Sequence, residues 1–363
     1  MTDIEYMKLA LQMAHSTKGQ TSPNPVVGAI VVKNGRVAGM GAHLKAGTEH
    51  AEVLALNMAG SDAEGATIYV TLEPCSHFGK TPPCADLIID KKVKRAVVAT
   101  LDPNPQVSGN GVRKLKKAGI EVTVGVKKEE ADWLNRHFFH YIRTGLPYVT
   151  LKSAASIDGK TATHTGESQW ITGPRAREDG HILRHEHDAI LVGIGTVLKD
   201  NPSLTVRTST GGIHPVRIIL DHQLRTPLTA KLLTDKQAPV WIFCSKEADS
   251  TKINRLEKAG AEVISISSKI EAGEVLQVLG KRKIQSVYVE GGAAVHGSFL
   301  EAKAFQEIVC YIAPKLIGGA DAPTVIGGTG FSSMAQVPEL DVVSLEQLES
   351  DIKMVAVPKR SKE

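Results

Sequence analysis

The sequence predicts two α/β domains, the first over residues 1–145 and the second over residues 146–363. At 363 residues the chain is long for one hydrophobic core, because a domain usually takes about 150 residues. Short apolar strand segments alternate with helical segments along the whole chain, which is typical of layered α/β folds. Residues 144–147 connect the end of a predicted helix to a strand, and each side has enough strands for its own core.

Composition and charge limit the classes of function. The chain is 42% hydrophobic and 23% charged, so a folded globular protein is expected. The net charge is only +4 and the lysines are spread along the chain, which argues against a nucleic-acid-binding surface. A small anionic ligand is compatible with this charge. The N-terminus does not resemble a signal peptide and no apolar run approaches membrane-spanning length, so a cytoplasmic location is expected.

The first domain is predicted to contain a mixed sheet. Met7, Leu11 and Ala14 have helical spacing and predict a helix over residues 3–18. A strand over residues 26–33 is followed by Asn34-Gly35, a pair typical of a hairpin turn, and by a return strand. The later predicted elements are helix 49–58 with Thr48 as its cap, strand 67–71, helix 82–90, strand 94–99, a helix ending at Gly119, strand 120–126 and helix 128–144.

Three potential metal ligands, His50, Cys75 and Cys84, fall at the ends of these elements. One imidazole and two thiols are the ligand number of a catalytic zinc that keeps its fourth position for water. His50 is predicted in the first turn of its helix, and Cys84 at a helix start, where the dipole favours the thiolate. Glu52 points away from His50 and can meet the water. The pattern indicates a zinc nucleobase deaminase, in which a zinc-held hydroxide attacks the ring and a glutamate carries protons.

Other interpretations explain fewer of these residues. A chance meeting of a core histidine with buried cysteines would leave Glu52 and the preceding prolines without a reason. A binding protein with a structural zinc would need a fourth protein ligand, and none stands nearby in the sequence. A nucleic-acid deaminase would need a basic channel and stacking aromatics, whereas aromatic residues make up 4% of the chain. Cys244 and Cys310 lie in apolar runs and are predicted to be core thiols.

Residues 22–28 (SPNPVVG), 50–52 (HAE) and 72–84 (LEPCSHFGKTPPC) resemble the deaminase half of the bifunctional riboflavin-biosynthesis deaminase/reductases. Residues 76–83 separate the cysteines, in place of the usual C-x-x-C spacing, and this long insert is characteristic of the riboflavin branch. The resemblance implies a cytidine-deaminase-like α/β/α fold. It also implies contacts to the pyrimidine or its ribose phosphate from Asn24, His43, His77 and Lys80. Without the resemblance, Asn24 is equally well a turn residue, Lys80 a solvent-facing lysine, and both histidines surface or packing residues.

The second domain begins with a predicted strand over residues 147–152, and Asp158-Gly159 suggests a hairpin turn. The segment 193–198 (GIGTVL) lacks the third glycine of a dinucleotide-binding fingerprint. Residues 288–292 (YVEGG), before a helix over residues 294–300, are the better nucleotide signal, because glycines let a phosphate approach exposed N–H groups. The other predicted elements are helices 174–187 and 251–259 and strands 189–192, 216–221, 240–244, 262–266, 286–290 and 307–313.

Four segments of this half resemble the riboflavin reductase family: residues 151–160, 192–196, 199–207 and 289–292. The resemblance covers nearly the whole chain and fades after about Asp341. It implies a dihydrofolate-reductase-like fold that uses NADPH. The residues that it places along the cofactor are Ala154, Trp170, Thr196, Asp200, Gly292, Ala293, Ala294, Val295, His296, Gly297 and Ser298. The residues that it places at the substrate are Ser168, Arg184, Leu204, Arg207 and Glu290.

The resemblance implies two successive reactions on one phosphorylated pyrimidine. Zinc-hydroxide deamination of 2,5-diamino-6-(5-phosphoribosylamino)pyrimidin-4-one, with Glu52 moving protons, is followed by hydride transfer from NADPH that turns the ribosyl chain into ribityl. Lys152 is a candidate to polarise or protonate the second substrate, and guanidinium groups at Arg184 and Arg207 suit its phosphate. A homo-oligomer, either a dimer or a tetramer, is expected, without nucleic-acid or membrane partners. The alternative is a nucleic-acid or nucleoside deaminase with an appended nucleotide-binding domain.

Overall fold

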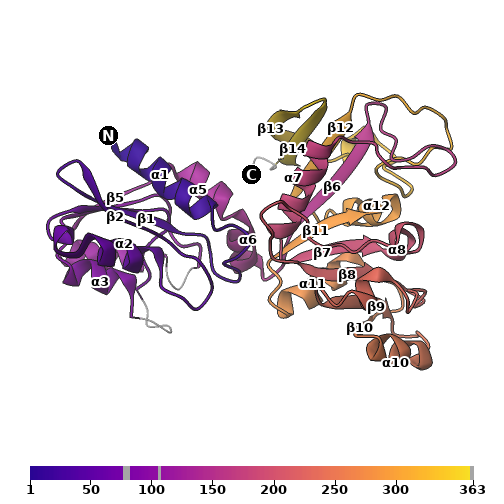
Figure 1. Ribbon diagram of the computed structural model, residues 1–363, viewed down its shortest axis with the longest axis horizontal. Coiled ribbons are helices and arrows are strands. Elements are labelled where there is room, and N and C mark those ends of the chain that lie inside the picture. The colour runs from indigo at the N-terminus through magenta and orange to yellow at the C-terminus, as the bar shows by residue number, and fades with distance from the viewer. Residues whose placement is uncertain (77–81, 105–107, 360–363) are drawn as a thin grey trace. The chain divides into compact units, whose positions relative to one another are not determined.

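The computed structural model describes residues 1–76, 82–104 and 108–359. The chain divides into two compact units, Met1–Gly145 and Leu146–Glu363, and each unit has its own sheet (Figure 1). Each unit also has its own buried apolar clusters. Within the described ranges, no helix combines the length and the apolar character needed to cross a bilayer.

The first unit contains a five-stranded mixed sheet, as predicted. β1 is antiparallel to β2 and β3, whereas β3, β4 and β5 are parallel. Asn34 and Gly35 between β1 and β2 have φ angles of 50° and 75°, the left-handed conformation that tight hairpin turns require, so the predicted hairpin is confirmed. The strand order β2-β1-β3-β4-β5 is formed by Arg36–Ala42, Gly28–Lys33, Thr67–Val70, Arg95–Val98 and Glu121–Val124.

Helices cover both faces of this sheet. Tyr6 and Met7 of α1 and Ala131 of α5 join one buried cluster, and α2, α3 and α4 contribute to a second cluster on the opposite face. The helices are α1 (Asp3–His15), α2 (Ala51–Ala59), α3 (Cys84–Asp90), α4 (Asn110–Lys117), α5 (Lys128–Leu134) and α6 (Arg136–Thr144), with a 3₁₀ turn at Gly60–Ala63.

Two helix predictions in this unit need correction. Residues 128–144 form two helices, because the Asn135 amide accepts the N–H of Val26 at 2.9 Å and donates to its carbonyl at 3.0 Å. This long-range pairing ends α5 at Leu134. The second correction concerns α2, which begins at Ala51, so that His50 is its extended N-cap residue and not part of the first turn; Thr48 is not the cap.

The second unit contains a nine-stranded sheet. Its strands run parallel from β10 to β12, and the hairpin of β14 and β13 is added antiparallel at the end. The order is β10-β9-β8-β7-β11-β6-β12-β14-β13. In chain order the strands are β6 (Tyr148–Ser156), β7 (Ala189–Gly193), β8 (Val216–Leu220), β9 (Val240–Ser245), β10 (Ala261–Ile266), β11 (Ser286–Gly291), β12 (Glu307–Ala313), β13 (Leu340–Leu348) and β14 (Asp351–Pro358).

Two helix layers enclose this sheet. α7 to α10 contribute to a buried cluster on one face, and α11 and α12 contribute to a cluster on the other. These helices are α7 (Pro174–His185), α8 (Ile194–Asp200), α9 (Lys231–Thr234), α10 (Ser250–Lys258), α11 (Ala272–Lys281) and α12 (Ala293–Glu301), with a 3₁₀ turn at Met334–Gln336.

The hairpin expected at Asp158-Gly159 is wrong. A tight turn forms there, with the Gly159 N–H bonded to the Ser156 carbonyl at 2.9 Å, but the chain does not return along β6. β6 is a central strand whose two edges are already paired in parallel with β11 and β12. Lys160 bonds back to Ser156, the last residue of β6, and then forms an isolated bridge to Thr324. The sequence predictions also omitted α8, α9, α11 and the β13–β14 hairpin.

Candidate active sites

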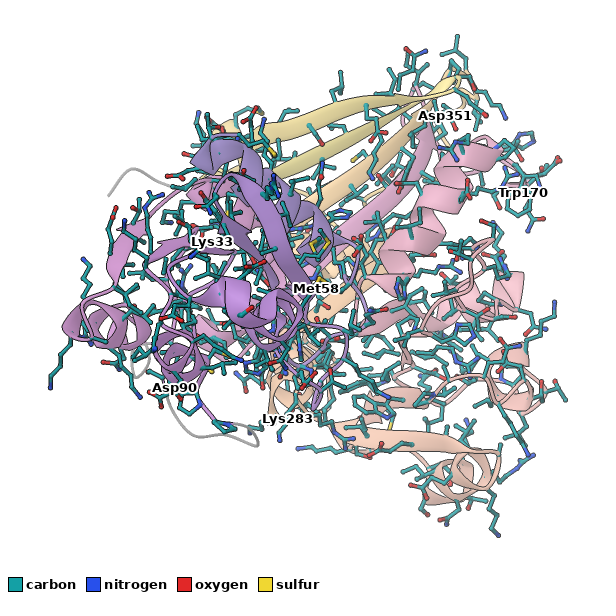
Figure 2. All side chains as sticks on the ribbon, turned by 60° about the vertical axis from the view of Figure 1, so that its left-hand side comes forward. Lys33, Met58, Asp90, Trp170, Lys283 and Asp351 are labelled. Atoms are coloured by element: carbon teal, nitrogen blue, oxygen red, sulfur yellow. The ribbon has the colours of Figure 1, made fainter. Side chains whose placement is uncertain are left out.

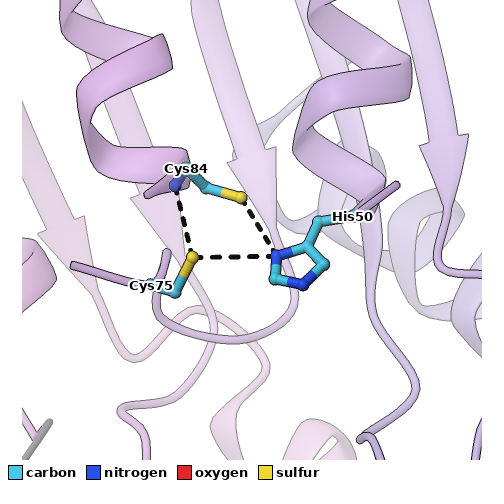
Figure 3. Close-up of side chains that lie close together, drawn as sticks. All are labelled: His50, Cys75 and Cys84. Atoms are coloured by element: carbon cyan, nitrogen blue, oxygen red, sulfur yellow. Dashed lines mark hydrogen bonds between the residues drawn. The ribbon is translucent and has the colours of Figure 1, made fainter. Parts of the chain in front are cut away.

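Three side chains of the first unit converge on one point (Figure 3). His50 Nδ1 lies 3.7 Å from Cys75 Sγ and 3.2 Å from Cys84 Sγ, and the three ligand atoms all lie within 4.8 Å of one another. Each ligand stands at an element end: His50 precedes α2, Cys75 follows β3, and Cys84 opens α3. Among the described residues, no fourth His, Cys, Asp or Glu joins the group.

The group fits a zinc ion. Zinc bonds of about 2.3 Å to sulfur and about 2.1 Å to nitrogen in a tetrahedron place the ligands roughly 3.6 Å apart, close to the observed separations. The two thiols interact strongly. Hydrogen bonds from the Cys84 thiol and from His50 lower the pKa of Cys75, whereas the bond to Cys75 and burial raise the pKa of Cys84. One thiolate is therefore favoured even before a metal adds its charge.

Glu52 lies in the first turn of α2 and is 3% exposed. Burial raises its pKa to about 7, and the Cys75 thiolate acts in the same direction. The position of α2 depends on Gly41 in β2, since a Cβ at that residue would lie 2.4 Å from the Ala51 carbonyl oxygen. This close contact between helix and strand holds Glu52 beside the ligand group.

A cavity of about 560 Å³ opens beside these residues. Two predicted substrate residues lie in its wall: Asn24 Nδ2 is 3.0 Å from His43 Nε2, and His43 Nδ1 is 3.0 Å from the Glu49 carbonyl oxygen. The other two, His77 and Lys80, lie outside the described residues. The cavity is lined by Pro23, Asn24, Pro25, Val27, His43, Ala46, Gly47, Thr48, His50, Glu52, Leu72, Glu73, Cys75, Asp102 and Phe138.

In the second unit, three predicted residues lie on the sheet face under α7. The Lys152 ammonium lies 5.8 Å from the ring centroid of Tyr311, whose hydroxyl donates to Asp179 of α7, and the Glu290 carboxylate pairs with Arg184 of α7. Both side chains therefore project from the face under α7. Arg184 of α7 reaches that face and donates to both carboxylate oxygens of Glu290 at 2.7 Å. Its guanidinium is thus held by a carboxylate, whereas the sequence predicted that it would bind a phosphate.

Charge and burial oppose each other at these groups. Burial acts to raise the pKa of Glu290, but Arg184 and Lys152 outweigh it and lower the pKa to about 2. Burial lowers the pKa of Lys152, and the charge of Glu290 partly restores it. The carboxylate therefore stays ionised, while the amine is easier to deprotonate than an exposed lysine.

The predicted cofactor residues gather where β7 and β11 run into α8 and α12. Gly292 is the N-cap of α12 with φ 85°, and the Thr196 hydroxyl oxygen lies 3.6 Å from the position that a Cβ would take there. His296 is turned inward: its ring nitrogens lie 3.1 Å and 3.3 Å from the carbonyl oxygens of Val325 and Val289. Ser298 donates to the Val295 carbonyl oxygen. These two side chains are thus engaged within the protein.

The other predicted residues lie around the same unit. Trp170 is 60% exposed in the loop before α7, with the Arg177 guanidinium 4.4 Å from its ring centroid (Figure 2). Arg207 is exposed, and its backbone nitrogen lies 3.3 Å from His181 Nδ1. Leu204 is buried with φ 53°. The remaining positions are Ala154 in β6, Ser168 in the same loop as Trp170, and Asp200 at the end of α8.

Three residues of the first cavity, Glu73, Asp102 and Phe138, have no role that the sequence predicted. Glu73 stands directly before Pro74-Cys75, so its position beside a ligand was visible in the sequence. Asp102 was assigned to a loop and Phe138 to a helix, and nothing in their local pattern indicated that they reach the cavity.

Comparisons with known proteins cover both units. Residues 147–354 match the RibD C-terminal domain, and residues 1–100 match the cytidine and deoxycytidylate deaminase zinc-binding region. The expected fading after Asp341 is therefore wrong, because β13 and part of β14 lie within the first match. The riboflavin biosynthesis protein RibD of Bacillus amyloliquefaciens is 54% identical over 99% of this chain and 97% of its own. RibD of Escherichia coli is 40% identical over 97% and 98%.

Solved structures give the same result. A structure of Acinetobacter baumannii RibD superposes with a TM-score of 0.89 at 40% identity and covers 99% of both chains. A diaminohydroxyphosphoribosylaminopyrimidine deaminase/5-amino-6-(5-phosphoribosylamino)uracil reductase from Thermotoga maritima superposes with a TM-score of 0.87 at 38% identity, covering 98% of this chain and 99% of its own.

Proposed function

This chain belongs to the RibD family of bifunctional riboflavin-biosynthesis proteins, and from that premise we propose which of its residues carry each reaction. The protein is a zinc-dependent pyrimidine deaminase joined to an NADPH-dependent reductase, with a cytidine-deaminase-like fold followed by a RibD reductase fold. The sequence predictions of fold class, activity and cofactors are thereby confirmed. We assign the deaminase to residues 1–145 and the reductase to residues 146–363.

The deaminase proposal rests on one observation: His50, Cys75 and Cys84 converge beside a buried Glu52 in the wall of a cavity. A zinc ion held by these three ligands supplies Lewis-acid activation of a water molecule. Glu52 accepts the proton of the attacking water and later delivers a proton to the departing ammonia, since its carboxyl group faces the same space.

Substrate contacts in the deaminase are assigned to polar groups of the cavity wall. The His43 ring is fixed by Asn24 on one side and by the Glu49 carbonyl on the other, so it presents a constant orientation to a ligand. We assign Asn24 and His43 to the pyrimidine. His77 and Lys80 are assigned to the pyrimidine or its ribose phosphate from the family resemblance alone.

In the reductase, we assign the proton chemistry to Lys152 and Glu290. NADPH supplies the hydride to C1′ of the opened ribose. Arg184 holds the Glu290 carboxylate in a fixed plane through two hydrogen bonds, and Lys152 lies on the same sheet face with a lowered pKa. Lys152 donates the proton that accompanies hydride transfer, and Glu290 stabilises the ammonium form before that step.

We assign the remaining substrate and cofactor contacts of the reductase to residues around Lys152 and Glu290. The exposed Arg207 binds the substrate phosphate, with Ser168, Arg184 and Leu204 shaping that side of the site. The cofactor lies along Ala154, Trp170, Thr196, Asp200 and residues 292–298. The side chains of His296 and Ser298 are bonded within the protein, so we assign the cofactor contacts of these two residues to the backbone of α12.

One substrate comparison tests the proposed function. The purified protein is given the 2,5-diaminopyrimidine ribosyl phosphate, free nucleosides or single-stranded DNA, and ammonia release is followed. Oxidation of NADPH is then measured with the deaminated product. We expect both signals only with the pyrimidine phosphate. Ammonia from DNA or nucleosides alone would favour the alternative of a nucleic-acid or nucleoside deaminase with an appended nucleotide-binding domain.

We also propose that the protein is a homo-oligomer whose second copy pairs along β13. This strand ends the nine-stranded sheet, and within the described residues it is paired only with β14. Val342 and Leu345 lie on one face of the hairpin, opposite Ala356 and Met354, and are 60% and 67% exposed. An exposed apolar edge strand is self-complementary in an antiparallel two-fold pair. Light scattering should report a dimer or larger assembly that Val342→Lys dissociates; a monomeric wild-type protein contradicts the proposal.

A cytoplasmic location is proposed from thiol chemistry. Cys75 and Cys84 bind metal as thiolates, and Cys244 and Cys310 are unpaired. A reducing compartment keeps all four in the required state.

A further inference from the structure

Glu73 lies between β3 and the zinc ligand Cys75, and its side chain is 5% exposed. Its carboxylate accepts three backbone N–H groups. Oε2 accepts those of Asp102 at 3.2 Å and Gly109 at 2.9 Å, and Oε1 accepts that of Val112 at 3.1 Å. One buried carboxylate thus joins the ligand segment to two later parts of the chain.

The bonds to Gly109 and Val112 make Glu73 the N-terminal cap of α4. Gly109 is the N-cap residue of that helix and forms no side-chain cap bond of its own. The first four N–H groups of a helix have no partner within it, and a negative charge there is favoured by the dipole. Glu73 supplies both the acceptor and the charge from a different segment.

α4 is also packed directly against the ligand segment. A Cβ at Gly111 would lie 2.1 Å from the Pro74 carbonyl oxygen, so only glycine permits this contact. Pro74 precedes the ligand Cys75. The N-terminal turn of α4 therefore contacts the residue immediately before the proposed zinc ligand Cys75.

Asp102 links the Glu73 carboxylate to the wall of the substrate cavity. Its N–H is bonded to Glu73, its carboxylate accepts the Asn104 N–H at 2.8 Å, and the residue lines the cavity together with Glu73 and Cys75. Loss of the bonds to the Glu73 carboxylate would free Asp102 in the cavity wall while leaving the side chains of His50, Cys75 and Cys84 in place.

We propose that Glu73 is a positioning residue for deamination: it fixes Asp102 and the start of α4 against the Cys75 segment, and so sets the shape of the substrate cavity. The inference rests on the proposed deaminase site and adds a residue that touches neither metal nor reacting atoms. Charge-assisted bonds to backbone N–H groups are among the stronger ones in a protein. Loss of the charge should therefore loosen the wall and weaken substrate binding more than turnover.

Glu73→Gln is the test, because the amide keeps the size of the side chain but turns an NH₂ group toward one set of N–H donors. We expect the deaminase KM to rise roughly tenfold with kcat changed less than about threefold, in line with a displaced binding wall. Zinc content and NADPH oxidation with the deaminated substrate should not change. Glu73→Asp keeps the charge and should give an intermediate KM.

Amide hydrogen exchange supplies a readout that is independent of activity. In Glu73→Gln the amides of Asp102, Gly109 and Val112 should exchange at least about tenfold faster, with the strands of the sheet unchanged. The matched control is Asp3→Asn, which removes the charge of a carboxylate that accepts bonds from Arg95 and Tyr69 in the same unit, and changes no group at the cavity. It should lower the melting temperature and leave the KM and these three amides unchanged.

Three outcomes overturn the proposal. Faster exchange with an unchanged KM would make Glu73 a helix cap only, and loss of zinc would make it a support of the metal ligands. Unchanged exchange would mean that the Glu73 carboxylate does not hold these three amides in place. Failure of the proposed function itself would be recognised separately, as a wild-type protein that releases no ammonia from the pyrimidine phosphate while the exchange result still holds.

Discussion

Arg184 and Glu290, 106 positions apart in the chain, form a bidentate ion pair with both N···O distances at 2.7 Å. Both side chains are largely buried, 15% and 10% exposed. The pair connects α7 to the carboxyl end of β11, where the proposed cofactor segment begins. It keeps the carboxylate ionised beside Lys152 and fixes the plane of the carboxylate.

Glu290→Gln should abolish NADPH oxidation and destabilise the second unit, because Arg184 is left buried without its countercharge. Breaking such a pair costs about 3 kcal/mol or more of unfolding free energy. Ammonia release should be unchanged. The control Glu262→Gln breaks an exposed pair with Arg282 in the same unit and should change the unfolding free energy by less than about 1 kcal/mol. Equal stability losses for the two variants would contradict this prediction.

The stabilisation from Glu290 should depend on pH. The folded pKa of about 2 lies below the ordinary value of 4.5, so the ionised group stabilises fully above about pH 4.5. That contribution is lost as the pH falls through the folded pKa. Denaturant unfolding of the wild type and Glu290→Gln at several pH values between 6 and 2, chosen at about one-unit steps, should show a stability difference that shrinks toward acid. A constant difference would argue against an ionised carboxylate in the fold.

Zinc should depend on the two thiols. Cys75→Ser and Cys84→Ser should each lose bound zinc and deamination, since a hydroxyl does not replace a thiolate ligand. Metal analysis of each purified variant, alongside the ammonia assay, measures both effects. Cys244→Ser, in the second unit, is the control and should keep both. Active wild-type protein without any transition metal would exclude the zinc site.

Glu52→Gln should keep zinc and fold but lose deamination by a factor of about 10²–10⁴, because this one group is proposed to serve both proton transfers. The control is Glu64→Gln, which removes only an exposed pair with Lys92 in the same unit. Zinc content and the melting curve show that the site is intact. Ammonia release near the wild-type rate would remove Glu52 from the mechanism.

The two reactions should be separable by mutation. The proposed deaminase residues all lie before Gly145, and the proposed reductase residues all lie at or after Lys152. Glu52→Gln should therefore still oxidise NADPH when given the deaminated substrate, and Arg207→Ala should still release ammonia while reducing poorly. A folded variant that loses both activities would indicate a composite site.

The sequence by itself determined the features that depend on residue type and short spacing. The Asn34-Gly35 turn, the alternation of helices and strands, and the set of His50, Glu52, Cys75 and Cys84 all follow from local preferences or from a motif that carries its own chemistry. Local preference decides such features because a turn or a helix start forms from a few consecutive residues.

Only the tertiary structure decided which distant groups share a site. The break at Asn135, the central position of β6 and the partners of Arg184 and Glu73 each depend on segments that meet through strand order. A helical pattern over residues 128–144 contains no sign that Val26 will bond to Asn135, and an arginine on α7 shows no preference between phosphate and carboxylate. A side chain takes its partner from the surface that the fold brings to it, and that surface is assembled from residues far apart in the sequence.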